Sequence, residues 1–149
     1  MSHVDRRLAA ALGGAGLLAL AGCGGTTASG AGPNDPPSRL IAVQGVEQRA
    51  VALTDRAQRR LGIRTEAVRT PAAGEHGTSV IPFAALLYDP EGKTWAYVLT
   101  GTRTYLRQPV SVQDVVGADV LLGSGPPVGT PVVTVGVAEL FGTEMGVEE

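Results

Sequence analysis

The stretch from Val80 to Val98, VIPFAALLYDPEGKTWAYV, carries the strongest hairpin pattern in the chain. Within it, DPEG places Pro90 second and Gly92 fourth in a turn, which is typical of a type I turn that leads into a bulge. The segment before the turn predicts a short strand that ends at Pro82, and then FAALLY as a strand buried on both faces. Because the segment after the turn returns as a third strand, this stretch predicts a β-rich fold.

The returning strand, TWAYVLT at 94–100, has side chains that alternate between its two faces. Trp95 and Tyr97 lie on one face and Ala96 on the other. Large aromatic side chains can fill and close a small core, which is one interpretation of this pattern. The alternative is that Trp95, Tyr97 and Tyr105, which belongs to the next predicted strand, contact a partner protein.

Most of the remaining chain also predicts short strands between glycine and proline turns. The 149 residues include 21 glycines and 10 prolines, a one-domain length with many turns. Further strands are expected at 46–53, 63–68 and 104–112. Residues 115–122 predict two apolar runs separated by a tight turn at GAD, and residues 131–142 predict a final strand followed by a short turn that carries Leu140 and Phe141. We therefore expect a mainly β fold, a small barrel-like or sandwich-like domain over residues 39–142, with an acidic tail over 143–149.

One short helix is expected at residues 55–61, DRAQRRL. Thr54 is a suitable N-cap, Asp55 complements the helix dipole, and Gly62 suits the position after the last helical residue. The helix gathers basic side chains, namely Arg56, Arg59 and Arg60, with Arg64 shortly after. These arginines form either a solvated face or a surface that contacts lipid headgroups or an acidic partner.

The N-terminus has the pattern of an export signal. Arg6 and Arg7 precede an apolar run that is too short for a transmembrane helix, which needs about 20 residues. The run ends in four residues that resemble a bacterial lipobox: Leu20, Ala21, Gly22 and Cys23. The resemblance implies a signal peptide over 1–22 and lipidation of Cys23, which is the only cysteine. The alternative is an ordinary signal peptide that happens to contain a cysteine.

Residues 24–38, GGTTASGAGPNDPPS, have the composition of a flexible linker. We expect residues 23–38 to comprise the lipidated cysteine and a tether. The tether would hold the folded domain roughly 20 Å from the membrane on the extracytoplasmic face of the cell membrane.

Composition and residue types argue against several classes of function. A net charge of −2 argues against the excess of positive charge that is typical of a nucleic-acid-binding surface. A hydrolase would need a serine, histidine and aspartate set, but His76 lies in a predicted loop and Ser124, in GSGPP, lacks the nucleophile-elbow pattern. A zinc site would need several histidines or cysteines. We therefore expect no enzyme activity, no metal site and no cofactor.

Two parts of the chain resemble the membrane fusion proteins, the periplasmic adaptor subunits of efflux pumps that serve resistance-nodulation-division (RND) transporters. VALTDRAQRRLGIRTEAV (51–68) resembles the adaptor segment in which a strand leads into a short helix and a second strand. VIPFAALLYDPEGKTWAYVL (80–99), YLRQPVSV (105–112) and LLGSGPPVGTPVVTVGVAEL (121–140) resemble the C-terminal membrane-proximal domain of that family. These motifs are structural rather than catalytic, and together they cover roughly residues 50–140.

The chain departs from the full-length adaptor pattern between these two parts. The resemblance implies that full-length adaptors carry a lipoyl-like domain, a helical hairpin and a β-barrel domain there, whereas this chain has about ten residues. It therefore implies an adaptor reduced to its membrane-proximal domain, a lipid-anchored, non-catalytic accessory subunit of an efflux transporter. Its partner would be a polytopic permease of RND or ABC type. The alternative is a stand-alone ligand-binding or structural envelope lipoprotein.

Overall fold

The computed structural model describes residues 35–146. The predicted signal peptide, the lipobox with Cys23 and the tether up to residue 34 lie outside the described residues. Residues 147–149 at the acidic C-terminus also lie outside them.

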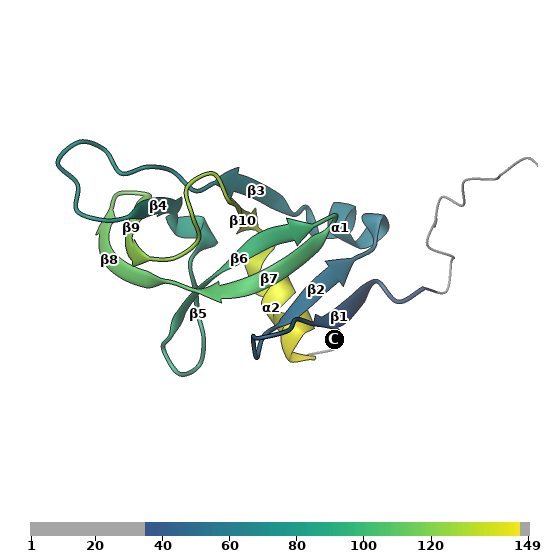
Figure 1. Ribbon diagram of the computed structural model, residues 1–149. Coiled ribbons are helices and arrows are strands. Elements are labelled where there is room, and N and C mark those ends of the chain that lie inside the picture. Colours follow the sequence, from purple (N-terminus) through teal and green to yellow (C-terminus); the bar gives the residue numbers. More distant parts are fainter. Residues whose placement is uncertain (1–34, 147–149) are drawn as a thin grey trace, which may run out of the picture. The chain divides into compact units, whose positions relative to one another are not determined.

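Two antiparallel sheets build the domain (Figure 1). The larger sheet has the order β1 (Ser38–Ala42), β2 (Arg49–Leu53), β7 (Thr104–Pro109), β6 (Thr94–Gly101), β10 (Pro131–Val135) and β3 (Arg64–Ala67), with β5 (Leu87–Tyr88) also paired to β6. The smaller sheet has the order β4 (Ser79–Pro82), β9 (Asp119–Ser124) and β8 (Ser111–Val116). Neither sheet of residues 35–146 closes into a barrel, so the expected mainly β fold is confirmed in its sandwich-like form.

Strand β6 lies between two apolar clusters because its side chains alternate between the faces of the larger sheet. One face contributes Ala96 and Val98 to a cluster that also contains Ile81 of β4 and Leu122 of β9. The other face contributes Tyr97, with side chains of the two helices, to the second cluster. The smaller sheet and the helices therefore cover opposite faces of the larger sheet.

Helix α1 (Asp55–Leu61) has the bounds expected from its sequence. Thr54 Oγ1 accepts a hydrogen bond from the backbone N–H of Ala57 at 3.2 Å, which satisfies one of the free donors of the first turn. Gly62 adopts a left-handed conformation with φ 63°, and its N–H bonds to the carbonyl of Arg59. Because the N–H of Ile63 also bonds to the carbonyl of Gln58, the helix ends in a Schellman motif.

The short turn expected after the final strand, around Leu140 and Phe141, is a helix instead. Strand β10 ends at Val135, and helix α2 (Val137–Met145) follows after Gly136. The expectation of an acidic tail over 143–149 is wrong at Glu144, which is 3% exposed on this helix. The helix buries Leu140 and Glu144 against the larger sheet, whereas Glu139 remains exposed.

The opening stretch folds as expected around its turn but not before it. The N–H of Gly92 bonds to the carbonyl of Asp89, and Gly92 has φ 79°, as the predicted turn and bulge require. FAALLY, however, is no buried strand: a 3₁₀ turn, η1 (Phe83–Ala85), precedes the two-residue β5. Only Ala85 of this turn is buried, while Phe83 and Tyr88 are 50% and 55% exposed.

Two strand boundaries also differ from expectation. Strand β1 begins at Ser38, inside the segment assigned to the tether. The predicted strand 104–112 is divided between β7 and β8 at Val110, whose N–H bonds to the carbonyl of Thr94 at 3.0 Å. This division passes the chain from the larger sheet to the smaller one.

The junction between β10 and α2 gives a stability prediction. Gly136 has φ 90°, and an added Cβ would lie 2.1 Å from Ile63 Cδ1. Gly136→Ala is expected to lower the free energy of unfolding by about 1–3 kcal/mol, because the left-handed backbone strains any side chain and Ile63 must move. Urea unfolding followed by circular dichroism measures the change.

Gly142→Ala is the matched control on the same helix. An added Cβ at Gly142 meets nothing within 4 Å, so the better helix propensity of alanine should raise the free energy of unfolding by about 0.5–1 kcal/mol. Equal effects of the two substitutions on the free energy of unfolding would contradict a left-handed backbone at Gly136 and a helical backbone at Gly142.

Candidate interaction surface

The three aromatic residues considered as partner contacts belong to the core. Tyr97 and Tyr105 are 0% and 1% exposed, and Trp95 is 8% exposed. The packing interpretation is therefore confirmed, and the burial contradicts the interface interpretation of these side chains. The exposed aromatic side chains of the opening stretch are instead Phe83 and Tyr88. Their positions in the sequence are consistent with exposure, because Phe83 follows Pro82 at the end of a strand and Tyr88 precedes the turn that begins at Asp89.

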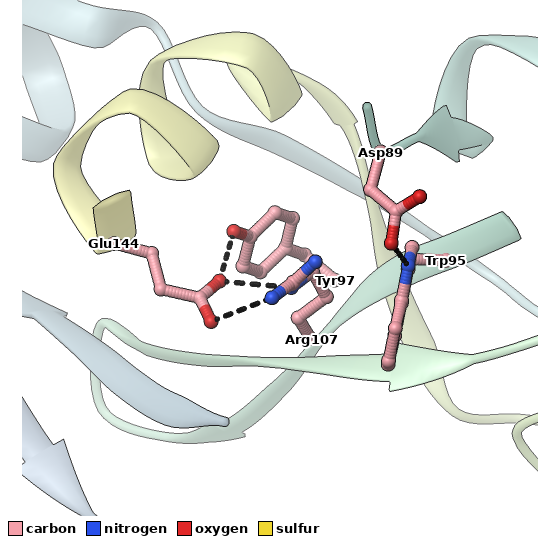
Figure 2. Close-up of polar contacts among 5 residues, drawn as sticks. All are labelled: Asp89, Trp95, Tyr97, Arg107 and Glu144. Atoms are coloured by element: carbon pink, nitrogen blue, oxygen red, sulfur yellow. Dashed lines mark hydrogen bonds and ion pairs between the residues drawn. The ribbon is translucent and has the colours of Figure 1, made fainter. Parts of the chain in front are cut away.

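Glu144 holds helix α2 against the central hairpin (Figure 2). The phenol of Tyr97 donates a hydrogen bond to Glu144 Oε2 at 2.5 Å. Arg107 Nη2 donates to Oε1 at 3.2 Å. Arg107 Nε lies 3.1 Å from Oε2, close enough for an ion pair but at an angle that makes no hydrogen bond. Both charged residues are at least nine-tenths buried, so each charge depends on the other for compensation.

Arg107 also packs between aromatic rings. Its guanidinium carbon lies 4.4 Å from the centre of the Trp95 ring and 5.2 Å from that of Phe141. These distances are within the range of cation–π attraction. Trp95 in turn donates from Nε1 to Asp89 Oδ2 at 2.8 Å, and the other carboxylate oxygen accepts from the N–H of Lys93. Two sets of polar contacts, one around Glu144 and one between Asp89 and Trp95 (Figure 2), are joined by the cation–π contact between Arg107 and Trp95. Together they connect helix α2, strands β6 and β7, and the turn at 89–92.

Two groups of this network have shifted acidities. Burial, with the hydrogen bond to Glu144 and the charge of that carboxylate, raises the pKa of Tyr97, so the phenol stays neutral and keeps donating. Desolvation acts to raise the pKa of Asp89, but the hydrogen bonds from Trp95 and from backbone N–H groups together outweigh it and lower the pKa. Both shifts favour the protonation states that the network needs at neutral pH.

The network supports the position of helix α2. The carboxylate of Glu144 is buried and engaged by a phenol and a guanidinium, so this carboxylate presents no free oxygen at the surface. Among residues 35–146, no cluster of three or more histidine, cysteine or acidic side chains could hold a metal ion.

The arginines of α1 are the predicted contact residues that the structure leaves accessible. Arg56, Arg59 and Arg60 are all exposed, and Arg59 forms an ion pair with Asp55 one turn earlier. A shallow, open hollow of about 300 Å³ lies beside the helix and is lined by Asp55, Gln58, Arg59, Gly62, Ile63 and Arg64.

The described part of the chain begins at the same end of the domain. The carbonyl of Pro37 accepts a hydrogen bond from the N–H of Thr54, the N-cap of α1, at 2.9 Å. Arg39 follows directly in β1 and pairs with Ala52 of β2. We define the basic pole as the five exposed arginines around this point: Arg39, Arg56, Arg59, Arg60 and Arg64.

Acidic side chains gather on the segments away from α1. Strands β8 and β9, the loop between β3 and β4, and the β5–β6 turn all lie on the side of the domain opposite α1 (Figure 1). These segments carry Glu75, Asp89, Glu91, Asp114 and Asp119. Of the two cations there, Arg69 is paired with Asp119 at 2.5 Å, and the other is Lys93. The domain therefore has unlike charges at its two ends.

Comparison with known proteins identified no relative. No protein-family model, no curated protein and no solved structure matches the chain. Within residues 35–146, no helix has the length and apolar character required to cross a membrane.

The buried ion pair gives a second stability prediction. Glu144→Ala leaves Arg107 buried without a counter-charge and should lower the free energy of unfolding by about 3–5 kcal/mol. Glu139→Ala, on the exposed face of α2, should lower it by less than about 1 kcal/mol. Urea unfolding of both variants measures the difference. A double replacement of Arg107 and Glu144 by methionine should recover part of the loss, and no recovery would contradict the charge explanation.

The raised pKa of Tyr97 predicts how stability depends on alkaline pH. An unfolded tyrosine loses its proton near a pKa of about 10, whereas folded Tyr97 keeps its proton to higher pH. Above pH 10 the folded state therefore binds more protons than the unfolded state, and stability falls as pH rises, by up to about 1.4 kcal/mol per pH unit for this group. Urea unfolding between pH 9 and 11.5 should show a shallower fall for Tyr97→Phe. Equal slopes would contradict the assignment.

Proposed function

We propose that this protein is a lipid-anchored, non-catalytic accessory subunit of a membrane exporter, related to the periplasmic adaptor subunits. Acyl chains on Cys23 would hold it at the extracytoplasmic face of the cell membrane. Two acyl chains are enough for stable anchoring, whereas a single chain is marginal. The domain would then dock on a polytopic permease of RND or ABC type.

The observation that carries this proposal is how the two adaptor-like parts fold together. Strand β2, from the first part, pairs with β7 of the second at Val51 and Tyr105. Strand β3, also from the first part, pairs with β10 from Val132 to Glu66. Two parts that full-length adaptors would separate by whole domains thus build one sheet here, as expected if both belong to a single membrane-proximal domain.

The connection between these parts supports the same interpretation. Residues 69–79 form a loop that leaves the sheet after β3 and returns through the bridge between Arg69 and Val80. This loop lies on the side of the domain opposite α1 (Figure 1). Further domains inserted at this loop would extend away from the membrane, so its shortness is compatible with a reduced adaptor.

Phe83 and Tyr88 are the best candidates for docking on the permease. Both residues are at least half exposed; Phe83 begins η1 and Tyr88 ends β5, in the same connection between β4 and β6. Exposed aromatic side chains often supply much of the binding energy of a protein interface. The buried aromatic residues of β6 and β7 would hold this connection in place.

The proposal is tested by crosslinking in native membranes, followed by capture of the full chain and mass spectrometry. One polytopic permease should be enriched with the native chain and lost with Cys23→Ser. Recovery of a folded chain without any permease would refute the accessory role and favour a stand-alone binding or structural lipoprotein.

The docking residues can be tested in the same experiment. Phe83→Ser with Tyr88→Ser should reduce permease capture at least about tenfold while the circular dichroism spectrum stays unchanged, because both side chains are exposed. Val128→Ser is the control, since Val128 is 51% exposed in the loop before β10. Undiminished capture by the double variant would move the docking site elsewhere on the domain.

A further inference from the structure

We propose that the basic pole binds the anionic phospholipid surface in which the protein is anchored, so that α1 faces the membrane. This inference rests on the lipid anchor of the proposed function, but it concerns a different surface and a different ligand. The ligand class is the phosphodiester headgroup of an anionic lipid. The anchor alone would limit distance from the membrane, whereas this contact would set orientation.

The path of the chain brings the basic pole to the membrane. The tether enters the domain at Pro37, directly beside the N-cap Thr54. Eleven residues lie between Cys23 and Asp35, a spacing whose root-mean-square span is roughly 20 Å for a glycine-rich linker. Electrostatic attraction is screened over about 8–10 Å at physiological salt. The pole nearest the anchor is therefore the part of the domain that reaches the attractive region most often.

The charges of the pole suit an anionic surface. Arg56 and Arg60 lie one turn apart on the exposed face of α1, and Arg64 follows at the start of β3. Three acidic residues are close in sequence to these arginines, namely Asp35, Asp55 and Glu66, and Asp55 forms an ion pair with Arg59. An arginine near an anionic bilayer is attracted by about 1 kcal/mol, so several together produce a substantial preference.

The hollow beside α1 provides a place for one headgroup. Arg59 and Arg64 line it from the helix and from β3, and Gln58 adds an amide. Asp55 also lines it and is paired with Arg59, so Arg64 is the arginine there whose guanidinium would meet the phosphate first. The planar guanidinium binds phosphate oxygens in a two-point arrangement that a lysine cannot reproduce. The volume of about 300 Å³ is open to solvent and is at the lower end of small-molecule sites, which suits a headgroup that remains attached to the bilayer.

The opposite end of the domain reinforces the orientation. Its acidic side chains on β8, β9 and the neighbouring loops would be repelled by the same surface that attracts the basic pole. Attraction at one end and repulsion at the other favour a single orientation. A uniformly basic domain would instead bind without a preferred face.

The test measures the orientation of the full, acylated chain in lipid vesicles. A fluorophore is placed at Thr65→Cys, beside the basic pole, or at Glu91→Cys, in the β5–β6 turn; both sites are exposed. Energy transfer to an acceptor lipid is compared in vesicles of phosphatidylcholine alone and with about a third phosphatidylglycerol. Transfer from residue 65 should rise with the anionic lipid, while transfer from residue 91 should stay level or fall, and 0.5 M salt should remove the difference.

Charge-matched variants identify the surface. Arg56→Glu with Arg60→Glu should reduce the ratio of membrane-facing to free domains at least about tenfold, as expected for two residues at about 1 kcal/mol each. Arg49→Glu with Lys93→Glu changes the net charge by the same amount outside the pole and should preserve the lipid response. Equal loss in both variants would overturn the proposal.

Vesicle flotation separates this inference from the anchor. If the chain floats with both lipid compositions but energy transfer does not change with the anionic lipid, the anchor is supported and the membrane-facing pole is refuted. An acidic protein surface would then be the partner of the basic pole. Flotation only with anionic vesicles would refute the anchor and support the pole. Failure to float with either composition would refute both.

Discussion

The carboxylate of Glu144 is the group on which the arrangement of this domain depends. It is buried on helix α2 and accepts from the phenol of Tyr97 and from the guanidinium of Arg107. A buried carboxylate is tolerated only when such partners compensate the lost hydration. Because these partners belong to β6 and β7, the ion pair fixes which part of the sheet α2 covers. Without α2, the face of the sheet that carries Tyr97 and Val133 would be open to water.

This constraint decides which side chains remain for binding. Strand β6 packs on both faces, so Trp95 and Tyr97 contribute to the interior although their residue types suit an interface. The surface features come from connecting segments instead, namely the exposed rings between β4 and β6 and the arginines around α1. A rigid two-sheet framework with its binding groups on connections is a common arrangement in proteins, because connections lie at the surface.

The sequence predicted the parts of the fold that local chemistry determines. Helix α1 was found with its correct bounds because Thr54 and Gly62 satisfy its ends by short-range hydrogen bonds. The turn after Asp89 was found because Gly92 permits a positive φ. Helix α2 was missed because Gly136 offers no side-chain cap and because Glu144 occupies a core position at helical spacing from Leu140 and Val137. Only the tertiary pairing with Arg107 makes that glutamate an inward-facing residue, and no local pattern reveals it.

The candidate site was predictable to a different extent. The exposure of the arginines could be predicted because they cluster on a short helix. Whether the aromatic side chains pack in the core or contact a partner depends on which strand is central in the sheet, and the sequence does not show this.

The two candidate surfaces would act together in an anchored protein. A tether restricts position and so raises the effective concentration of the domain near a permease, but it leaves rotation free. If the basic pole also faces the lipid, rotation is restricted before the partner arrives, and less orientational freedom is lost when Phe83 and Tyr88 dock. The unlike charges of the two ends would then contribute to transport through the assembly of the complex rather than through any contact with the transported molecule.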